Sequence, residues 1–419
     1  MHVIYNFLIV VLEKLIPLTK IFSKKMKLFV DGRKHVFHIL KENISEKDQV
    51  IWMHAASLGE YEQGVPILEA LKTKFPVHKI LVTFFSPSGY EVKKTSELAD
   101  VITYLPLDTK RNAKRFVELA HPGLSLFIKY EVWPNYLKIL NQNNIPTLLI
   151  SGNFRKDQIF FRSQANFMKN ALHKFDHLFV QNRASKELLE VNGFKNVSIS
   201  GDTRFDRVSN QLELDNHLAF VEEFKNDKLC IVGGSTWPED ENILLEYINK
   251  ATKDVKFIIA PHEIKKSKIE NFQSRIHKSS VLFSEKQGKE LKDYDILIID
   301  TVGLLTKIYA YADIAFVGGA SGNTGLHNIL EPAAFGIPVI IGNNYQNFPE
   351  AKMLQQKDGL FSVDDASECS IILHKLVSKD AYRYEIGKNA KNFIENNRGA
   401  TDKITSYIDK SFECAKSGE

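Results

Sequence analysis

The stretch IWMHAASLGEYEQG at residues 51–64 sets the pattern for the whole chain. An apolar run from Val50 to Met53 has the length of a buried strand, and small residues follow it before a helix-like segment at 61–74. Glu60 stands where that helix would begin, a position at which the helix dipole favours a carboxylate and lowers its pKa. The stretch therefore predicts a strand, a tight turn and a helix, which is the repeating unit of a parallel α/β sheet.

The same unit recurs along both halves of the chain. Strand-like segments of the first half lie at 49–55, 79–85, 101–107, 124–130, 146–151, 177–182 and 197–201. Those of the second half lie at 228–235, 256–262, 280–284, 295–300, 313–319 and 338–342. Because segments with helical spacing alternate with them, we expect an α/β protein with two doubly wound, Rossmann-like sheets facing each other across a ligand-binding cleft.

Length and composition define the expected domain organisation. With 419 residues, 44% of them apolar and 25% charged, the chain can form two globular domains. We assign an N-terminal membrane-association segment (1–35), a first domain (36–206), a linker (207–227), a second domain (228–380) and C-terminal helices (381–419). The C-terminal helices are candidates to cross back to the first domain.

Charge and cysteine content exclude several classes of protein. The chain has 55 Lys and Arg against 51 Asp and Glu, and this net charge of +4 is too small to predict nucleic-acid binding. Cys230, Cys369 and Cys414 have no metal-ligand spacing and form no even set. We therefore expect a reducing compartment, no disulfide and no zinc site.

The amino terminus differs from this globular pattern. Its apolar run from Val3 to Leu12 has about half the ~20 residues that a spanning helix needs, and no small-residue cleavage site follows. A basic cluster comes next, made of Lys20, Lys24, Lys25, Lys27, Arg33 and Lys34. We therefore favour a helix that lies in or dips into the cytoplasmic membrane surface. A helix that packs on the protein or crosses the bilayer is the alternative.

A glycine-rich loop in the second half, residues 318–338, indicates a nucleotide site. Gly318 and Gly319 follow a strand and allow a ligand to approach the backbone, and a helix beginning near residue 327 would aim free N–H groups at a phosphate. Glu331 could then accept hydrogen bonds from two ribose hydroxyls. The loop lacks the G-x-G-x-x-G fingerprint of dinucleotide binding. The alternative is a glycine-rich turn with an acidic residue favoured by the helix dipole.

Four other strand ends carry polar residues. Ser235 can cap a helix after the segment CIVGG, and His262 follows the strand-like IIAP. Glu131 stands between aromatic residues in YEVWPN, and Arg204 follows a strand in GDTRF. Each has a structural alternative: a helix cap, a core histidine, an exposed carboxylate and a surface salt bridge. A functional role for these residues depends on the strand ends lying close together in the fold.

Taken in order, these motifs resemble one enzyme family. The segments HAASLGE (54–60), YEVWPN (130–135), GDTRFD (201–206), GGST (233–236) and HNILEPAAFGIPVIIG (327–342) are similar to those of 3-deoxy-D-manno-octulosonic acid (Kdo) transferases of lipopolysaccharide assembly. The resemblance implies a GT-B fold, CMP-Kdo as donor in the second domain and a lipid A precursor as acceptor at the first. It also implies inverting transfer with no metal and no cofactor, at the cytoplasmic face of the inner membrane.

The resemblance also implies roles for particular residues. Glu60 matches the general base, Glu131 matches a residue of the transition-state environment, and Arg204 is placed to stabilise the leaving phosphate. Pro261, His262, Gly303, Leu304, Leu305, Asn328, Ile329, Leu330 and Glu331 match CMP-contacting segments, to which the strand-end argument adds Ser235, Gly318 and Gly319.

Three alternatives stay open at the sequence level. The chain could be another GT-B glycosyltransferase, a sugar-nucleotide epimerase, or a non-catalytic nucleotide-binding protein of the membrane surface. The apolar, basic amino terminus favours a lipid acceptor over a soluble one, and the presence of both Glu60 and Glu131 argues against a non-catalytic protein.

Overall fold

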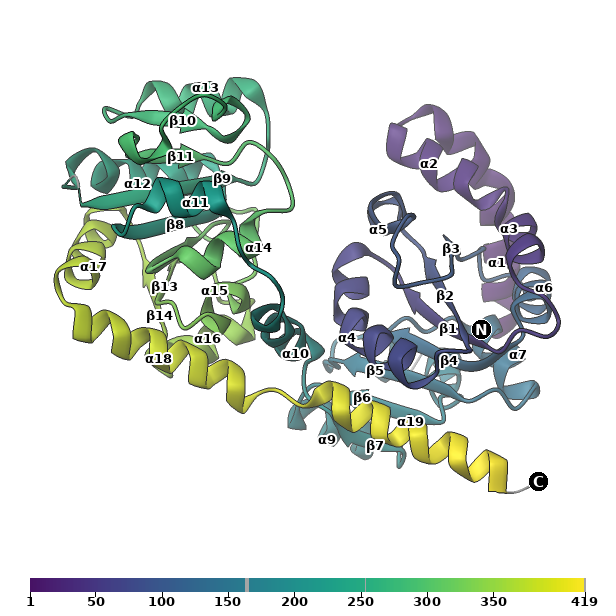
Figure 1. The fold of residues 1–419 in the computed structure, drawn as a ribbon. Coiled ribbons are helices and arrows are strands. Elements are labelled where there is room, and N and C mark those ends of the chain that lie inside the picture. Colours follow the sequence, from purple (N-terminus) through teal and green to yellow (C-terminus); the bar gives the residue numbers. More distant parts are fainter. Residues whose placement is uncertain (163–165, 253, 418–419) are drawn as a thin grey trace. The chain divides into compact units, whose positions relative to one another are not determined.

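The computed structural model describes residues 1–162, 166–252 and 254–417, with side chains up to residue 410. It divides the chain into two compact units. The first holds Met1–Arg207 and the chain from Arg398 onward, and the second holds Val208–Asn397. Each unit contains one parallel sheet with its own helices (Figure 1).

The first unit is built on a seven-stranded sheet with the order β3-β2-β1-β4-β5-β6-β7. Its strands are β1 (Val50–Ala55), β2 (Lys79–Phe84), β3 (Val101–Tyr104), β4 (Pro122–Ile128), β5 (Thr147–Gly152), β6 (His177–Val180) and β7 (Val197–Ile199). Its helices are α1 (His2–Leu15), α2 (Lys24–Arg33), α3 (Val36–Asn43), α4 (Leu58–Lys74), α5 (Pro87–Lys93), α6 (Lys110–Ala120), α7 (Pro134–Gln142), α8 (Asn166–Leu172), α9 (Arg183–Val191), α10 (Thr203–Asn210), which continues past the unit boundary, and α19 (Ala400–Ser417).

The central strand β1 shows why its sequence is a continuous apolar run. Val50 and Trp52 pack into a core that includes residues of α3, α6 and α7. Ile51 and Met53 point to the opposite face, into a core shared with α4 and α19. Because successive side chains of a strand point to opposite faces, a strand covered on both faces needs apolar residues at almost every position.

The second unit repeats the plan with a sheet of order β10-β11-β9-β8-β12-β13-β14. Its strands are β8 (Leu229–Thr236), β9 (Val255–Pro261), β10 (Ser280–Leu282), β11 (Ile296–Ile298), β12 (Ile314–Val317), β13 (Val339–Gly342) and β14 (Leu360–Val363). Its helices are α11 (Ala219–Lys225), α12 (Pro238–Lys250), α13 (Lys266–Ser274), α14 (Leu305–Ile308), α15 (Leu330–Ala334), α16 (Pro349–Gln355), α17 (Ala366–Ser378) and α18 (Asp380–Asn396).

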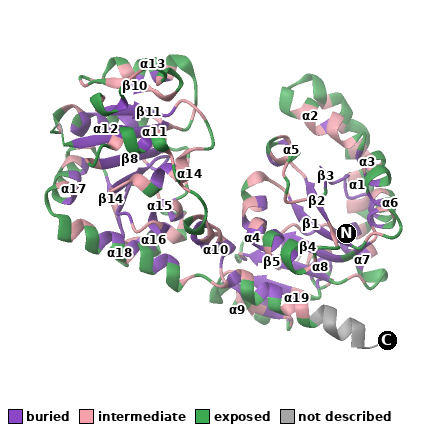
Figure 2. Cartoon of the chain, in the orientation of Figure 1, coloured by how far each residue is buried: buried purple, intermediate pink, exposed green. Residues whose placement is uncertain are grey.

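Both faces of the second sheet are also buried. Ile231 and Phe257 pack with residues of α12 and α17 on one face, and Val232 and Ile258 pack with Phe224 of α11 on the other. Figure 2 shows the strands of each unit as buried and the outer faces of the surrounding helices as exposed. The expected α/β architecture of two doubly wound parallel sheets is confirmed.

The expected linker is partly helical, and the expected C-terminal helices divide between the two units. The expected linker, 207–227, contains α11, whose Val221 and Phe224 are fully buried in the second unit. The expected C-terminal helices are two separate elements, because Gly399 adopts a φ of 97° between α18 and α19. Ile404 of α19 is buried in the core of the first unit, whereas α18 belongs to the second.

Strand β14 was not expected from the sequence. It is a four-residue edge strand in which only Leu360 and Val363 are buried, so its apolar signal is weak. Of the cysteines, Cys230 and Cys369 are buried free thiols, and Cys414 lies beyond the described side chains.

Helix α1 and the following turn, His2–Ile21, are long and apolar enough to cross a membrane by length and composition alone. Its residues are not buried in the protein. One side of α1 nevertheless contacts the first unit, since the Tyr5 hydroxyl donates to Asp108 Oδ2 at 2.7 Å and Asn135 Nδ2 donates to Asn6 Oδ1 at 2.8 Å.

Candidate active site

The turn from β1 into α4 places Glu60 in the first turn of that helix. Ser57 is the residue before the helix, and its backbone N–H donates to Glu60 Oε2 at 3.0 Å while its hydroxyl contacts the same oxygen at 3.3 Å. A Cβ added at Gly59 would meet no atom within 4 Å, so the backbone beside Glu60 borders open space. Glu60 therefore caps the helix and remains accessible from one side.

The pKa of Glu60 is raised above its ordinary value. Burial is the largest cause, and the negative charge of Glu131 adds to it. Lys129, the Ser57 N–H and His54 act in the opposite direction. The expectation that the helix start would lower this pKa is wrong, because loss of solvent and a second carboxylate outweigh the helix terminus.

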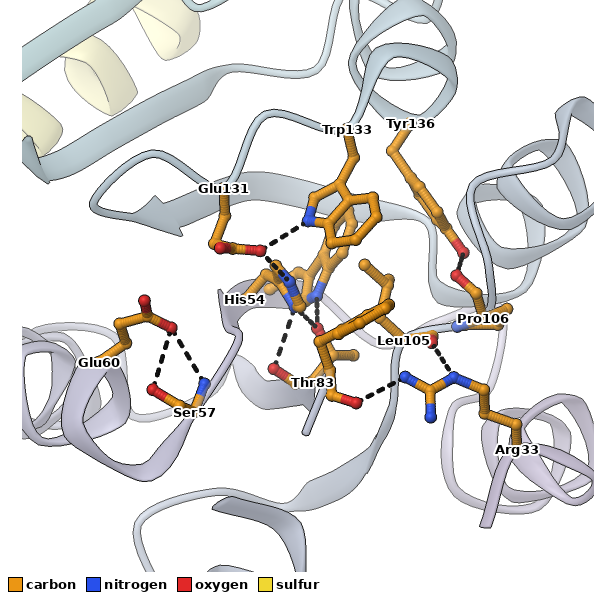
Figure 3. A network of polar contacts seen from close by, with 12 residues as sticks. Arg33, His54, Ser57, Glu60, Thr83, Leu105, Pro106, Glu131, Trp133 and Tyr136 are labelled. Carbon is orange, nitrogen blue, oxygen red and sulfur yellow. Dashed lines mark hydrogen bonds and ion pairs between the residues drawn. The ribbon is translucent and has the colours of Figure 1, made fainter. Parts of the chain in front are cut away.

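Glu131 lies in the loop between β4 and α7. Trp133 Nε1 donates to Glu131 Oε2 at 3.0 Å, and the side chain is only 15% exposed. Lys129, two residues earlier, has a φ of 62°, which is uncommon for a residue with a side chain and marks a constrained turn at the end of the strand. The structure thus brings Glu60 and Glu131 to the same carboxyl edge of the first sheet (Figure 3).

Behind these carboxylates lies a buried polar group that the sequence reasoning missed. His54 Nε2 lies 3.4 Å from Glu131 Oε2, and its Nδ1 lies 2.9 Å from the hydroxyl of Thr83 on β2. Trp52 Nε1 donates to the same hydroxyl at 2.8 Å. The available signal was a histidine on the otherwise apolar strand β1, and its partners could not be identified without the pairing of β1 with β2.

Arg33, taken above as part of a basic membrane-facing cluster, lies instead at the ends of β2 and β3 (Figure 3). Its Nε donates to Leu105 O at 3.0 Å and its Nη2 to Phe85 O at 2.6 Å. The guanidinium carbon is 3.6 Å from the centroid of the Phe29 ring. Arg33 therefore links α2 by hydrogen bonds to the ends of β2 and β3.

Arg204 lies at the start of α10. Its Nε donates to Asp202 Oδ2 at 2.9 Å, and its Nη2 lies 2.8 Å from the same oxygen. The side chain of Arg204 is 33% exposed. The salt bridge that we considered as the structural alternative is therefore present, and any contact of Arg204 with a phosphate stays a proposal.

In the second unit one carboxylate binds the glycine loop through hydrogen bonds from backbone N–H groups. Asp240 of α12 is fully buried and accepts N–H groups from Trp237 at 2.9 Å, Gly319 at 2.8 Å and Ser321 at 3.3 Å. The Gly318 N–H donates to Gly234 O at 2.9 Å. These loop N–H groups are therefore bonded within the protein.

The segment after the loop also differs from the expected phosphate-binding helix. Helix α15 has five residues, and the N–H of Leu330 at its start donates to Asn328 Oδ1 at 3.1 Å. Glu331 accepts from Asn328 Nδ2 and from the Thr306 hydroxyl, both at 3.0 Å. The side chains of Ile329 and Leu330 are buried, so these two residues belong to the core. Binding of a phosphate at this helix start stays a prediction.

Three aromatic rings of the second unit stack on one another. The ring centroids of Trp237 and His262 are 4.7 Å apart, and those of His262 and His327 are 4.4 Å apart. Trp237 Nε1 donates to His327 Nε2 at 3.0 Å, so this nitrogen carries no hydrogen. Burial, with help from His262, lowers the pKa of His327 to about 4. The stack is therefore a largely neutral, flat surface.

The remaining predicted residues surround this stack. Pro261 ends β9 and lies beside Trp237 in a small cavity, and Ser235, with a φ of 52°, ends β8. Gly303 has a φ of 92° and turns the chain into α14, which Leu304 precedes and Leu305 begins. Among the described residues, no group of three or more His, Cys, Asp or Glu side chains is placed to hold a metal ion.

Comparisons with known proteins show which proteins the chain is similar to. A family model described as 3-deoxy-D-manno-octulosonic-acid transferase (kdotransferase) matches residues 32–207. The 3-deoxy-D-manno-octulosonic acid transferase of Aquifex aeolicus (strain VF5) is 30% identical over 346 residues, which cover 81% of this chain and 89% of the relative. That of Haemophilus influenzae is 27% identical over 376 residues, with 86% of each chain covered.

A solved structure shows the same architecture. The UDP-GlcNAc 2-epimerase from Neisseria meningitidis bound to UDP-GlcNAc aligns with a TM-score of 0.61 over 86% of this chain and 100% of that one. The sequences are only 13% identical, so the likeness concerns the fold. Together with the two parallel sheets, it identifies the fold as GT-B type.

Proposed function

This chain belongs to the 3-deoxy-D-manno-octulosonic acid (Kdo) transferase family, and we propose that it transfers Kdo from CMP-Kdo to a lipid A precursor in lipopolysaccharide synthesis. As a member of that family it is a glycosyltransferase. The identity of donor and acceptor, the inverting course and the roles of single residues are parts of the proposal.

The observation that carries the proposal is the pair of carboxylates at one edge of the first sheet. Glu60 has a raised pKa, borders open space and lies near Glu131. A carboxylate with a raised pKa is a stronger base than an ordinary carboxylate. This supports Glu60 as the general base.

The reaction follows from that assignment. The acceptor hydroxyl oxygen attacks the anomeric carbon of Kdo, and its proton passes to Glu60. The new carbon–oxygen bond forms as the bond from the anomeric carbon to the phosphate oxygen breaks, and CMP leaves with that electron pair. Glu131 lies where positive charge develops, and Arg204 supplies a cation for the leaving phosphate. In this proposal no metal and no cofactor takes part.

The donor would bind at the edge of the second sheet. The flat surface of Trp237, His262 and His327 suits a nucleotide base, since aromatic rings stack on one another. Glu331, fixed by Asn328 and Thr306, is positioned as the acceptor for ribose hydroxyls. The loop glycines Gly318 and Gly319 then contribute by allowing close packing, because a Cβ at Gly318 would lie 2.4 Å from Ser235 O.

Helix α1 supports a location at the cytoplasmic face of the inner membrane. Its polar residues Tyr5 and Asn6 bond to the first unit, while apolar residues remain exposed. The exposed apolar side chains are Val3, Ile4, Phe7, Leu8, Val10, Leu12, Leu15, Leu18, Ile21 and Phe22. Because the polar side of the helix is already bonded to the protein, we favour a helix that lies in the membrane surface over one that crosses it.

The membrane part is tested by vesicle flotation of the full chain with anionic lipids. The double variant Phe7→Glu, Leu18→Glu is expected to float less than the wild type, and Val77→Glu, an exposed apolar residue elsewhere on the chain, serves as the matched control. Equal flotation of all three proteins would contradict a membrane role for α1.

The transfer itself is tested by mass measurement of the lipid product. The full chain is incubated with freshly generated CMP-Kdo and a tetraacyl disaccharide precursor, with and without a metal chelator. Addition of one or more Kdo units in both arms supports the proposal. Release of CMP with no gain in lipid mass would overturn the acceptor assignment, and loss of transfer on chelation would overturn the metal-free mechanism.

A further inference from the structure

His54 is the fully buried polar residue of β1, and its ring is fixed on several sides. The ring centroid of Phe127 lies 5.8 Å away and that of Trp133 6.0 Å away, both at steep angles to the imidazole. Thr83 Oγ1 and Thr83 O lie 2.9 Å and 3.1 Å from Nδ1. Such a packed ring presents its other nitrogen, Nε2, in one direction, toward Glu131.

We propose that His54 is a positioning residue, which holds Glu131 by a hydrogen bond from its Nε2–H and leaves Glu131 Oε1 for the reacting centre. The proposal rests on the function proposed above, in which Glu131 belongs to the reaction site. Its basis is the set of polar atoms that meet at Thr83.

The donors and acceptors around Thr83 fix where the imidazole hydrogen lies. Trp52 Nε1 is a donor only, so the Thr83 hydroxyl accepts from it at 2.8 Å. The hydroxyl hydrogen then points to His54 Nδ1, which accepts it. In the neutral ring this arrangement places the hydrogen on Nε2.

The opposite neutral form has an acceptor for its Nδ1–H, the Thr83 carbonyl oxygen at 3.1 Å, but it fails at Nε2. A hydrogen on Nδ1 would leave Nε2 bare, facing a carboxylate oxygen at 3.4 Å, so that two acceptors would meet inside the protein. It would also leave the Thr83 hydroxyl hydrogen without the Nδ1 acceptor. A doubly protonated ring would still place a hydrogen on Nε2. Every form that satisfies Glu131 therefore has an Nε2–H.

The Nε2 atom has no hydrogen bond of normal length in this structure, although it is completely buried. The distance of 3.4 Å is slightly longer than a made bond, and catalytic hydrogen bonds commonly shorten when substrates bind. Glu131 Oε2 would then accept from both Trp133 and His54. Among the described residues Oε1 has no donor in the hydrogen bonds of the structure, so it is the oxygen left to face the substrate.

This arrangement gives the two carboxylates different tasks. The charged and titratable groups that act on Glu60 are Glu131 and Lys129 from the loop after β4 and His54 from β1. A donor on Glu131 spreads its negative charge and limits the extent to which Glu131 suppresses ionisation of Glu60. Removal of the donor should weaken Glu60 as a base most strongly at low pH.

The hydrogen position is tested directly by NMR on the full chain with 15N-labelled histidine. The signals of His54, one of 13 histidines, are identified by their loss in His54→Gln. We expect Nε2 to carry a hydrogen, in the neutral or the charged ring. A neutral ring with its hydrogen on Nδ1 would overturn the proposal, whatever the activity of the protein.

The kinetic consequence is tested with variants that keep the bulk of the ring. His54→Met is expected to lower turnover about tenfold to a hundredfold, the range for a hydrogen bond to a charged group, with a greater loss at pH 6 than at pH 9. His54→Gln should recover part of that loss, since its amide offers an N–H. Equal loss at every pH, or no recovery by Gln, would indicate a merely structural role and overturn the proposal.

Thr83→Val removes the hydroxyl and keeps the shape of the side chain. Its matched control is Thr103→Val on neighbouring β3, since Thr103 is also fully buried and its hydroxyl has no hydrogen-bond partner. We expect a pH-dependent loss of turnover for Thr83→Val and none for Thr103→Val, and equal behaviour of the two would contradict the proposal. If the wild type transfers no Kdo, the proposed function fails instead, and the NMR result still stands by itself.

Discussion

Glu60 and Asp240 occupy the same position in the two halves of the molecule. Each is a carboxylate in the first turn of the helix that follows an interior strand of its sheet, β1 or β8, and each accepts the N–H of the residue before that helix, from Ser57 at 3.0 Å and from Trp237 at 2.9 Å. Asp240 is fully buried and also binds two N–H groups of the glycine loop. Glu60 has a bordering open space and no such loop.

The difference shows how one local motif serves two purposes. Asp240 has the shorter side chain. Its carboxylate accepts hydrogen bonds from backbone N–H groups and so holds the glycine loop in place. The side chain of Glu60 is one methylene longer, and among the described residues its Oε1 has no donor in the hydrogen bonds of the structure. A carboxylate with unmet hydrogen-bonding capacity beside a second carboxylate is available for proton transfer, whereas a fully bonded one is structural.

The largest effect is expected from Glu60→Gln, which removes basicity and keeps size. Turnover with CMP-Kdo and acceptor should fall about 10²–10⁴-fold, the usual contribution of a general base, while CMP affinity stays close to that of the wild type. Product formation is followed by lipid mass and CMP binding by calorimetry. Glu69→Gln, an exposed position on the same helix, is the matched control.

A second substitution at this position separates capping from catalysis. Glu60→Asp shortens the side chain to that of Asp240, so it should keep the bond to the Ser57 N–H and the stability of the fold but lose most of the turnover. Near-normal turnover of Glu60→Gln would show that the base lies elsewhere, and near-normal turnover of Glu60→Asp would show that the reaction tolerates the shorter carboxylate.

The next effect is expected from Asp240→Asn in the second unit. The amide can accept through only one of its two terminal atoms, so at least one buried N–H loses its acceptor, at a cost of about 1–3 kcal/mol. The urea midpoint and the CMP affinity should both fall, since the loop is held less firmly. Glu239→Gln, its exposed neighbour, is the control, and a drop in turnover with unchanged CMP affinity would contradict the structural role.

His327 is expected to make the stability of the protein depend on pH. Its pKa in the folded protein is lowered to about 4, below the ordinary value of 6.5, first because of burial. The unfolded chain therefore takes up a proton between these values and the folded chain does not, so the stabilisation is present above pH 6.5 and is lost as pH falls to 4. We expect the wild type to lose about 1–3 kcal/mol from this residue between pH 7.5 and pH 4.5.

His327→Phe should keep the stacked ring and abolish that part of the pH dependence. Urea denaturation of both proteins at the two pH values measures it as a difference. If the two proteins lose the same amount of stability on acidification, His327 is not held neutral by its surroundings.

The smallest effect is expected from Ser57→Ala. It removes the hydroxyl that contacts Glu60 Oε2 and keeps the backbone N–H, so the helix start should lose about 0.5–2 kcal/mol of stability. Turnover should change far less than in Glu60→Gln, because the base itself remains. A loss of turnover equal to that of Glu60→Gln would show that the hydroxyl, and not the carboxylate alone, takes part in catalysis.

Much of the fold could be predicted from residues that are close in sequence. Apolar runs such as 50–53 lie on strands because both faces of each sheet are covered, and Glu60 does begin a helix. The order of the motifs identified the family, which the relatives confirm. The sequence did not predict strand β14, because an edge strand with two buried residues has little hydrophobic periodicity.

The site depended on contacts between distant residues. The pairing of β1 with β2 sets His54 beside Thr83, 29 positions away, and Asp240 reaches Gly319 across 79 positions. Because of the second contact an N–H group of the glycine loop is bonded within the protein, and burial together with the charge of Glu131 raises the pKa of Glu60 where the helix start alone would lower it.

The sequence by itself determined the alternation of strands and helices, the two-unit plan and the position of Glu60 at a helix start, because these depend on periodicity and on caps within a few residues. Tertiary structure alone decided which carboxylate is fully bonded and which keeps an open side. Parallel strands bring their carboxyl ends together only after long crossovers, so the charge of Glu131 that acts on Glu60 and the loop N–H groups that bind Asp240 come from residues remote in the chain.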